Sequence, residues 1–189
     1  MILAPERWHQ LLTTSPAFED WPVTDGLAGL TGGPILFAFS VGIIVPPDVL
    51  AQYDHAYNFH AGSSRFPGRD PHHWAVYEGA EWFGVTLHRM TAKVDDGPIV
   101  AGYPIRIGDM GAQELRRTAE LYLVALWCEW APKLLTWSPE PERTPSTSWT
   151  GPPRRRADLL KLLDCRGLPP EEVARRQKAF EGFPLIAPA

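Results

Sequence analysis

The sequence predicts an α/β protein with a mainly parallel sheet, and three observations favour that fold class. Apolar stretches of strand length alternate along the chain with stretches that have helical spacing. The longest apolar stretch, residues 34–44, is almost continuously apolar, as expected of a strand covered on both faces of a parallel sheet. The length of 189 residues and the hydrophobic fraction of 44% are enough for one buried core.

The elements follow in order from proline, glycine and β-branched residues. Pro5 and Pro71 each stand where a helix begins, because proline fits the first helical turn, and Gly79 stands just past the end of the second helix. The first ninety residues are expected to form a helix at 5–13, a loop at 15–33, a strand at 34–44, helical turns at 46–53, a strand at 56–60, a helix at 71–79 and a strand at 84–90.

The second half of the chain begins with a turn at 94–97 and a strand at 98–107. The clearest helix, at 109–133, is expected because apolar residues recur there at spacings of three and four: Leu115, Ala119, Tyr122, Leu126 and Trp130. Residues 136–153 are rich in Pro and Ser and are expected to run irregularly over the surface. Short helical patterns follow at 157–164 and 170–180. We therefore expect an α/β domain at 1–135, then a Pro-rich segment and a helical C-terminal extension at 136–189.

Charge and composition exclude several classes of protein. The net charge of −4 gives no electrostatic reason to expect a nucleic-acid partner, and the three arginines at 154–156 are interpreted as a solvated helix start. Cys128 and Cys165 form no CxxC pair, so neither a disulfide framework nor a zinc ribbon is indicated. The N-terminus lacks the apolar run of a signal peptide, and no stretch has the ~18–20 apolar residues of a membrane span. We expect a cytoplasmic protein that binds neither nucleic acid nor membrane.

Polar side chains stand at the ends of the expected strands. Asn58 and His60 end one strand, His88 stands near the end of the next, and Asp95 and Asp96 lie in the turn that follows. In an open α/β sheet, ligands bind beyond the carboxyl ends of the strands. A His can move protons near neutral pH, an Asn can donate to an oxyanion, and a carboxylate can orient an imidazole and favour its charged form. The set suits acyl transfer through a tetrahedral intermediate without a protein nucleophile.

Each of these residues also has a structural interpretation. A single Asn or Asp at a strand end or in a turn commonly just forms the turn, and a single His is more often structural than catalytic. A metal site is the competing chemical interpretation, because five of the six His residues lie between residues 55 and 88. They form no HExxH or other tight ligand pair, and the adjacent His72 and His73 would point about 100° apart on a helix. We therefore expect no metal.

Four motifs, in order, give residues 34–107 a resemblance to a known family. They read FAFSVGIIVP, NFHAGSSRFPGRDPHHWAVYEG, GVTLHRM and VDDGPIV. The arrangement resembles the catalytic half of the folate-dependent formyltransferases, which act on glycinamide ribonucleotide, methionyl-tRNA or nucleotide sugars. The resemblance implies a Rossmann-like formyltransferase fold with residues 1–135 as the catalytic domain. The family has a longer βαβ region before the first of these motifs, so the fold is expected to be truncated in its N-terminal half.

The resemblance also implies the site residues. The family's catalytic Asn, His and Asp correspond to Asn58, His60 and Asp95, and Gly97 fixes the last of them because the family pattern is D-x-G. The implied contacts of the formyl-folate are Phe39, Ser40, Val41, Gly42, Ile43, Val94 and Asp96. The loop at 61–70 is expected to line the acceptor site, with Ser63, Arg65 and Arg69 as contacts and the arginines suited to a phosphate or carboxylate.

These implications favour an enzyme that moves a formyl group from 10-formyltetrahydrofolate to an amine of a small molecule. The shortened N-terminal region lacks the family's ribonucleotide-phosphate loop, which favours a nucleotide-linked amino sugar or another specialised metabolite as acceptor. Two alternatives stay open: hydrolysis of formyltetrahydrofolate, and a non-catalytic folate- or nucleotide-binding role. A shortened sheet also leaves an exposed edge, which favours a homodimer.

Overall fold

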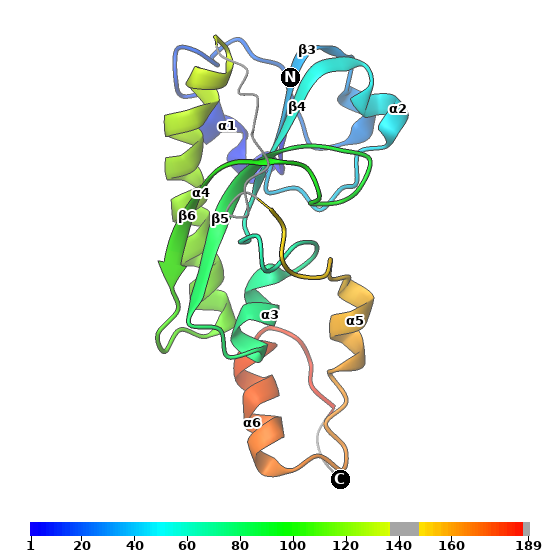
Figure 1. Cartoon of the computed structure of the whole chain (residues 1–189), viewed down its shortest axis with the longest axis vertical. Coiled ribbons are helices and arrows are strands. Elements are labelled where there is room, and N and C mark those ends of the chain that lie inside the picture. The colour runs from blue at the N-terminus through cyan, green and yellow to red at the C-terminus, as the bar shows by residue number, and fades with distance from the viewer. Residues whose placement is uncertain (137–147, 187–189) are drawn as a thin grey trace.

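A six-stranded sheet forms the centre of the fold, and the computed structural model describes residues 1–136 and 148–186 (Figure 1). The strands are β1 (Ile2–Leu3), β2 (Val23–Thr24), β3 (Gly33–Phe39), β4 (Tyr53–His60), β5 (Trp82–Arg89) and β6 (Ile99–Arg106), in the spatial order β2-β1-β3-β4-β5-β6. The pairings among β2, β1, β3 and β4 are parallel, whereas β5 and β6 each run antiparallel to the preceding strand. The predicted α/β class and mainly parallel sheet are confirmed.

Helices connect and cover these strands. They are η1 (Glu6–Trp8), α1 (His9–Leu12), η2 (Leu27–Gly29), α2 (Pro47–Leu50), α3 (Pro71–Tyr77), α4 (Ala112–Leu134), α5 (Arg156–Lys161) and α6 (Pro170–Ala179). Proline stands at the start of α2, α3 and α6, where its missing N–H leaves no hydrogen bond unmade. Each helix expected from the sequence is therefore present, although the first is divided into η1 and α1.

The region before residue 34, for which a helix and a loop were expected, also contains two strands, β1 and β2. β1 pairs in parallel with both β2 and β3. Each has only two residues, which is too short to produce a periodic signal in the sequence. The N-terminal part of the sheet is therefore present in a reduced form.

The apolar stretch 34–44 is only partly a strand. β3 ends at Phe39, and Ser40 adopts a left-handed conformation with φ of 51°, which turns the chain out of the sheet. Residues 41–46 then continue without regular structure to the start of α2. The second half of this apolar run is therefore free to line a cavity instead of the core.

One face of the sheet packs against α4 through aromatic side chains. The ring of Trp127 lies 5.4 Å from Phe37, 5.8 Å from Phe39 and 5.1 Å from Phe59, measured between centroids. These rings and Tyr57 are buried, so they make up a large share of the apolar surface removed from water. The sheet that carries the polar residues of β4 is therefore held from behind by a rigid core.

The buried face of α4 differs slightly from the predicted one. Its buried residues are Ala112, Leu115, Ala119, Leu123, Leu126, Trp127, Ala131 and Leu134. Tyr122 is instead 41% exposed. The helix carries apolar residues on more than one of its faces. The face that is buried is the one with Trp127, whose ring packs against Phe37 and Phe59 of the sheet.

The C-terminal extension lies beside α3, at the end of the molecule away from β1 (Figure 1). The guanidinium of Arg176 in α6 donates to the carbonyls of Leu162 and Asp164 at 2.8 and 2.9 Å, which ties α6 to the segment after α5. Helix α6, which follows residue 135, packs against α3, which precedes it. The domain boundary near residue 135 stays a prediction. The part of the Pro-rich segment at 137–147 lies outside the described residues.

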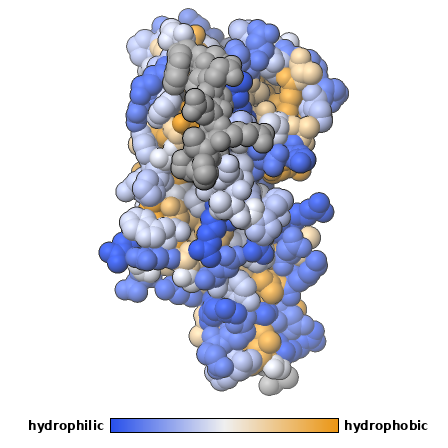
Figure 2. All heavy atoms as spheres, in the orientation of Figure 1, coloured by the Kyte–Doolittle hydropathy of each residue, from blue (hydrophilic) through white to orange (hydrophobic). Residues whose placement is uncertain are grey.

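The surface carries hydrophilic side chains over most of the face shown in Figure 2, with exposed apolar residues in separate small groups. Within the described ranges, no helix combines the length and apolar character needed to cross a membrane.

Candidate active site

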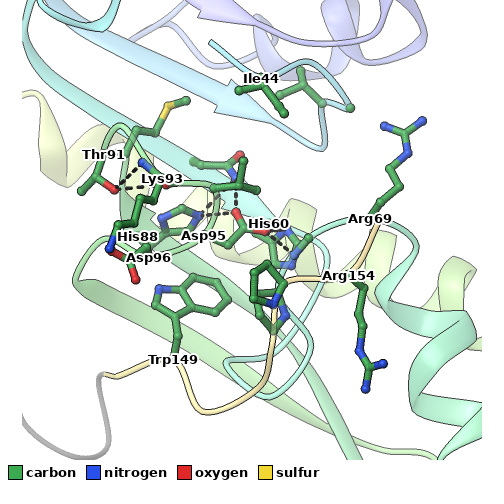
Figure 3. Close-up of a pocket in the computed structure, with 18 of the residues that line it drawn as sticks. Ile44, His60, Arg69, His88, Thr91, Lys93, Asp95, Asp96, Trp149 and Arg154 are labelled. Atoms are coloured by element: carbon green, nitrogen blue, oxygen red, sulfur yellow. Dashed lines mark hydrogen bonds and ion pairs between the residues drawn. The ribbon is translucent and has the colours of Figure 1, made fainter. Parts of the chain in front are cut away.

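A cavity of about 720 Å³ opens beside β4, where four stretches of chain meet (Figure 3). The stretches are residues 41–45, 67–69, 90–96 and the described part of the Pro-rich segment with the start of α5, 149–156. Asn58 and His60 of β4 and His88 of β5 line the cavity between them. This volume is within the range of small-molecule sites.

The register between β4 and β5 brings the three polar side chains to one face. Asn58 stands opposite His88, and His60 stands opposite Thr86. Residues two apart on a strand share a face, and so do residues directly opposite each other, so Asn58, His60 and His88 point to the same side. From the sequence, the carboxyl ends of the strands were expected to meet at one edge of the sheet. The residues do come together, but through the overlap of two antiparallel strands.

Asp95 completes a group that we call the polar cluster: Asn58, His60, His88 and Asp95. Its Oδ2 accepts a 2.7 Å hydrogen bond from the backbone N–H of Gly68 and lies 3.5 Å from His60 Nδ1. Its Oδ1 lies 3.2 Å from His88 Nε2 and 3.5 Å from Asn58 Nδ2. The carboxylate is thus the hub of the cluster.

The environment of Asp95 keeps it ionised. Burial alone would raise the pKa of this carboxyl, but His60, His88 and the Gly68 N–H hold the pKa well below its usual range. Asp95 also has a φ of 45°, a conformation that Asp adopts more readily than most residues. A turn of this shape directs the side chain inward.

The next residue is directed differently. Asp96 has a side chain 53% exposed and meets Lys93 at 3.9 Å, as expected of a weak surface pair. Gly97 follows, and a Cβ there would come within 1.9 Å of the Arg89 carbonyl, so only glycine fits. The glycine that set the register in the sequence therefore has a steric role in the turn.

His60 lies between two oxygen acceptors. Its Nδ1 faces Asp95, and its Nε2 lies 3.3 Å from the carbonyl of Phe66. Burial lowers the pKa of His60, the Asp95 carboxylate opposes this, and His88 lowers it further. The imidazolium would satisfy both acceptors, whereas burial favours the neutral ring, so His60 holds its proton weakly.

His88, which the sequence places near the end of a strand without indicating a role, belongs to the polar cluster. Its Nδ1 lies 2.9 Å from the Arg89 carbonyl and therefore donates there. Its Nε2 lies 3.1 Å from Asn58 Nδ2 and 3.2 Å from Asp95 Oδ1. His88 thus has Nε2 within reach of both the Asn58 amide and the Asp95 carboxylate. Its place in GVTLHRM was the available signal.

Asn58 is held by the nitrogen end of its amide. Nδ2 meets His88 and, at the longer distance of 3.5 Å, Asp95. Within the described residues, Asn58 Oδ1 is buried without a hydrogen-bond partner. The longer contact, to Asp95, is the weaker of the two. The Nδ2 hydrogen that makes it can therefore be redirected to a substrate oxygen most easily.

The residues expected to contact the formyl-folate divide into two groups. Five of them line the cavity: Val41, Gly42, Ile43, Val94 and Asp96. Phe39 does not, because its side chain is fully buried in the core beside Trp127. Ser40 forms the turn after β3 and is not among the lining residues. The alternation of a strand sends Phe39 to the opposite face from the cavity.

The expected acceptor contacts divide in the same way. Arg69 lines the cavity, and its side chain is 46% exposed. Ser63 and Arg65 do not line it, and Arg65 instead extends toward Glu78, 3.4 Å away. The loop turns at Phe66, which is buried, so residues before it face away from the cavity.

The cavity is lined by both apolar and cationic side chains. Ile43, Ile44 and Val94 are exposed, which is unusual for large apolar residues and suits a flat, partly apolar ligand. Arg69 and the arginines at 154–156 line the same cavity, and a Cβ at Gly42 would come within 1.5 Å of the Arg69 guanidinium. Three of these four arginines have carboxylate partners: Arg69 meets Asp70 at 3.9 Å, Arg154 pairs with Glu78 at 2.6 Å, and Arg156 pairs with Asp70. The simple helix-start interpretation of 154–156 is therefore incomplete.

Trp149 was missed by the sequence analysis. It belongs to a segment that was expected to run over the surface, yet it lines the cavity and lies close to both histidines of the cluster. No periodic or motif signal marks it. In the described part of the chain, no three His, Cys, Asp or Glu residues are arranged to hold a metal ion.

Comparisons with known proteins agree with this fold. Residues 34–119 match the family model described as formyl transferase. This chain is also 36% identical to the bifunctional polymyxin resistance protein ArnA of Wigglesworthia glossinidia brevipalpis over 75 residues. The matched residues are 39% of this chain and 12% of the length of that curated relative.

Two solved structures share the fold. One is a Mycobacterium tuberculosis protein thought to be a sugar N-formyltransferase, with a TM-score of 0.72 and 17% identity over 96% of this chain and 88% of that one. The other is a Helicobacter canadensis N-formyltransferase in complex with folinic acid and dTDP-3-aminofucose, with a TM-score of 0.64 and 18% identity over 87% of this chain and 62% of that one. At these identities the likeness concerns the fold.

Proposed function

We propose that this chain, in which residues 34–119 belong to the formyl transferase family, moves a formyl group from 10-formyltetrahydrofolate to an amine of a small molecule. The observation that carries the proposal is the polar cluster on the wall of the cavity, with Asp95 Oδ2 3.5 Å from His60 Nδ1. An amide donor, an imidazole and a buried carboxylate around one cavity are the groups that formyl transfer requires.

The reaction passes through a tetrahedral intermediate. The nitrogen of a neutral acceptor amine attacks the formyl carbon, and the carbonyl oxygen becomes an oxyanion. Asn58 Nδ2 and the protonated imidazole of His60 stabilise this oxyanion, for which Asn58 gives up its 3.5 Å contact with Asp95. The acceptor nitrogen then loses a proton, the bond from the formyl carbon to the folate nitrogen breaks, and that nitrogen takes up a proton.

Asp95 supports the charge that His60 carries during this sequence. Its carboxylate is held ionised, and it opposes the effect of burial on the His60 proton. His60 Nε2 has a long contact of 3.3 Å with the Phe66 carbonyl, and such a contact is readily exchanged for a substrate atom. His88 acts as a positioning residue through Asn58 and Asp95.

The lining of the cavity suits the two substrates. The exposed apolar residues Ile43, Ile44 and Val94 would hold the flat ring system of the folate. Arg69, whose side chain is 46% exposed, would bind an anionic group of the acceptor, such as a phosphate. We therefore propose a nucleotide-linked amino sugar or a similar anionic metabolite as acceptor, which agrees with the dTDP-sugar in the Helicobacter canadensis complex. A homodimer stays a prediction.

The proposal is tested by incubating the full chain with 10-formyltetrahydrofolate and a panel of dTDP- and UDP-linked amino sugars. We expect one of them to gain a formyl group, detected by mass spectrometry, with release of tetrahydrofolate. Formate release with every acceptor would establish a hydrolase instead. Binding of the folate by calorimetry without any turnover would establish a binding protein.

A further inference from the structure

Trp149 stands at the start of a segment that is fixed against the loop after β4. We call residues 149–156 the C-terminal wall. The backbone N–H of Thr150 donates to the Ser64 carbonyl at 2.9 Å, and backbone hydrogen bonds of 2.8 and 3.0 Å join Arg154 to Arg69 and Pro67. These bonds hold the wall at the edge of the cavity.

Gly151 shows how closely the C-terminal wall approaches that loop. A Cβ at Gly151 would come within 1.8 Å of the Arg65 carbonyl, which no side chain could tolerate without a backbone shift. The position of Trp149 is therefore set by backbone contacts on its C-terminal side, and not only by its own ring.

The indole lies against the polar cluster (Figure 3). Its ring centroid is 5.0 Å from that of His88 and 5.8 Å from that of His60, with the rings nearly perpendicular at 88° and 70°. Its Nε1–H donates to the carbonyl of Gly97 at 2.8 Å, two residues beyond Asp95. One side chain thus contacts both imidazoles and the turn that carries the carboxylate.

We propose that Trp149 keeps water away from the formyl carbon at the polar cluster, and so sets the chain to transfer the formyl group to an amine instead of to water. This inference rests on the proposed formyl transfer and adds the residue that decides between its two outcomes.

The polar cluster cannot make that choice alone, because its chemistry serves both nucleophiles. An amine attacks the formyl carbon to give a formamide, and water attacks it to give formic acid. In each case the bond to the folate nitrogen breaks, that nitrogen gains a proton, and the nucleophile loses one; formic acid then ionises to formate in solution. Asn58 and His60 stabilise the same oxyanion in both. Discrimination must come from access, and a large apolar ring beside the imidazoles removes places where water could be held.

The test compares variants that keep or remove apolar bulk at this position: Trp149→Phe, Trp149→Leu and Trp149→Ala. Each protein is given 10-formyltetrahydrofolate with hydroxylamine as the probe amine, and formohydroxamate and formate are both quantified against a sample without protein. Trp82→Ala is the matched control, because Trp82 is 53% exposed and is not among the residues that line the cavity.

We expect Trp149→Ala to lower the ratio of formohydroxamate to formate about tenfold, a factor that corresponds to about 1.4 kcal/mol between two competing barriers. Trp149→Phe and Trp149→Leu should keep a ratio near that of the wild type, because bulk and not the indole N–H excludes water. Trp82→Ala should leave the ratio unchanged.

Two results would overturn the inference. The first is an unchanged product ratio in Trp149→Ala, with circular dichroism showing a folded protein. The second is a fall of about tenfold in the product ratio of Trp149→Phe relative to the wild type, which would assign the effect to the hydrogen bond with Gly97. This comparison does not use the alanine variant, so it decides even if that variant does not fold. If the wild type forms neither product here and formylates none of the amino sugars in the panel above, the proposed function itself is wrong, and the inference is wrong with it.

Discussion

Two regions bound the cavity, and they are held in different ways. The polar cluster stands mainly on β4 and β5, whose backbones are hydrogen-bonded in a sheet and backed by the aromatic core around Trp127. The C-terminal wall has little regular structure and is held by a few backbone contacts to the loop at 64–69. Groups that must keep a fixed geometry therefore stand mainly on the sheet, whereas the position of the wall depends on a few backbone contacts to a loop.

Substitution of His60 or Asn58, the two polar-cluster residues on β4, should lower kcat more than any other change proposed here. His60→Ala is expected to lower kcat by on the order of 10²–10⁴, the scale of a general acid or base. Asn58→Ala is expected to lower it by about 10²–10³, the scale of one oxyanion donor. Both are measured from tetrahydrofolate release under saturating donor and acceptor.

His55→Ala is the control for these variants, because His55 lies on the same strand, β4, and is not among the residues lining the cavity. A loss in His55→Ala equal to that in His60→Ala would mean that imidazoles of β4 matter for folding and not for the reaction.

Substitution of the two adjacent aspartates tests which of them, Asp95 or Asp96, supports the proton on His60. Asp95→Asn keeps the shape but removes the charge that favours the His60 proton, so the apparent pKa of the group governing activity should fall in the pH–rate profile. The exposed Asp96→Asn should change kcat by less than about threefold, as expected of a surface pair worth under ~1 kcal/mol. If Asp96→Asn abolished turnover while Asp95→Asn did not, the assigned role of Asp95 would be wrong.

The arginines test the acceptor side. The sequence alone made Arg65 and Arg69 equivalent, whereas only Arg69 lines the cavity. Arg69→Ala should raise the KM of an anionic acceptor about tenfold, because a hydrogen bond to a charged group contributes about 1.5–3 kcal/mol, and leave the KM of the folate unchanged. Arg65→Ala is the matched control. Equal KM values in both variants and the wild type would remove Arg69 from the acceptor site.

The last prediction concerns acid stability and a histidine of α3 that does not line the cavity. Burial and the nearby His73, Arg116 and Arg156 lower the pKa of His72 to about 3. The unfolded chain, with a pKa near ~6.5, therefore binds more protons between about pH 6.5 and 3, and stability falls as pH falls through this window.

His72→Gln should reduce that acid dependence, by at most about 1.4 kcal/mol per pH unit. The measurement is the free energy of unfolding by urea at pH 7 and pH 4. An identical pH dependence in variant and wild type would contradict the assignment.

Much of this molecule follows from local sequence. Alternation, proline and glycine predicted the main strands and helices, because those signals depend on neighbours along the chain. The motif order predicted Asn58 and His60, and Gly97 predicted the choice of Asp95 over Asp96, which agrees with the buried and exposed positions of the two aspartates. The catalytic roles of these residues stay predictions.

Only the tertiary structure decided the direction of β5, the inward face of Asp95, the separation of Arg65 from Arg69 and the place of Trp149. Each depends on contacts between segments far apart in the chain: the hydrogen bond from Trp149 to Gly97 joins residues 52 positions apart. A side chain in an irregular segment has no periodicity that reveals its partner, and its environment is determined only when the folded backbone brings that partner within reach.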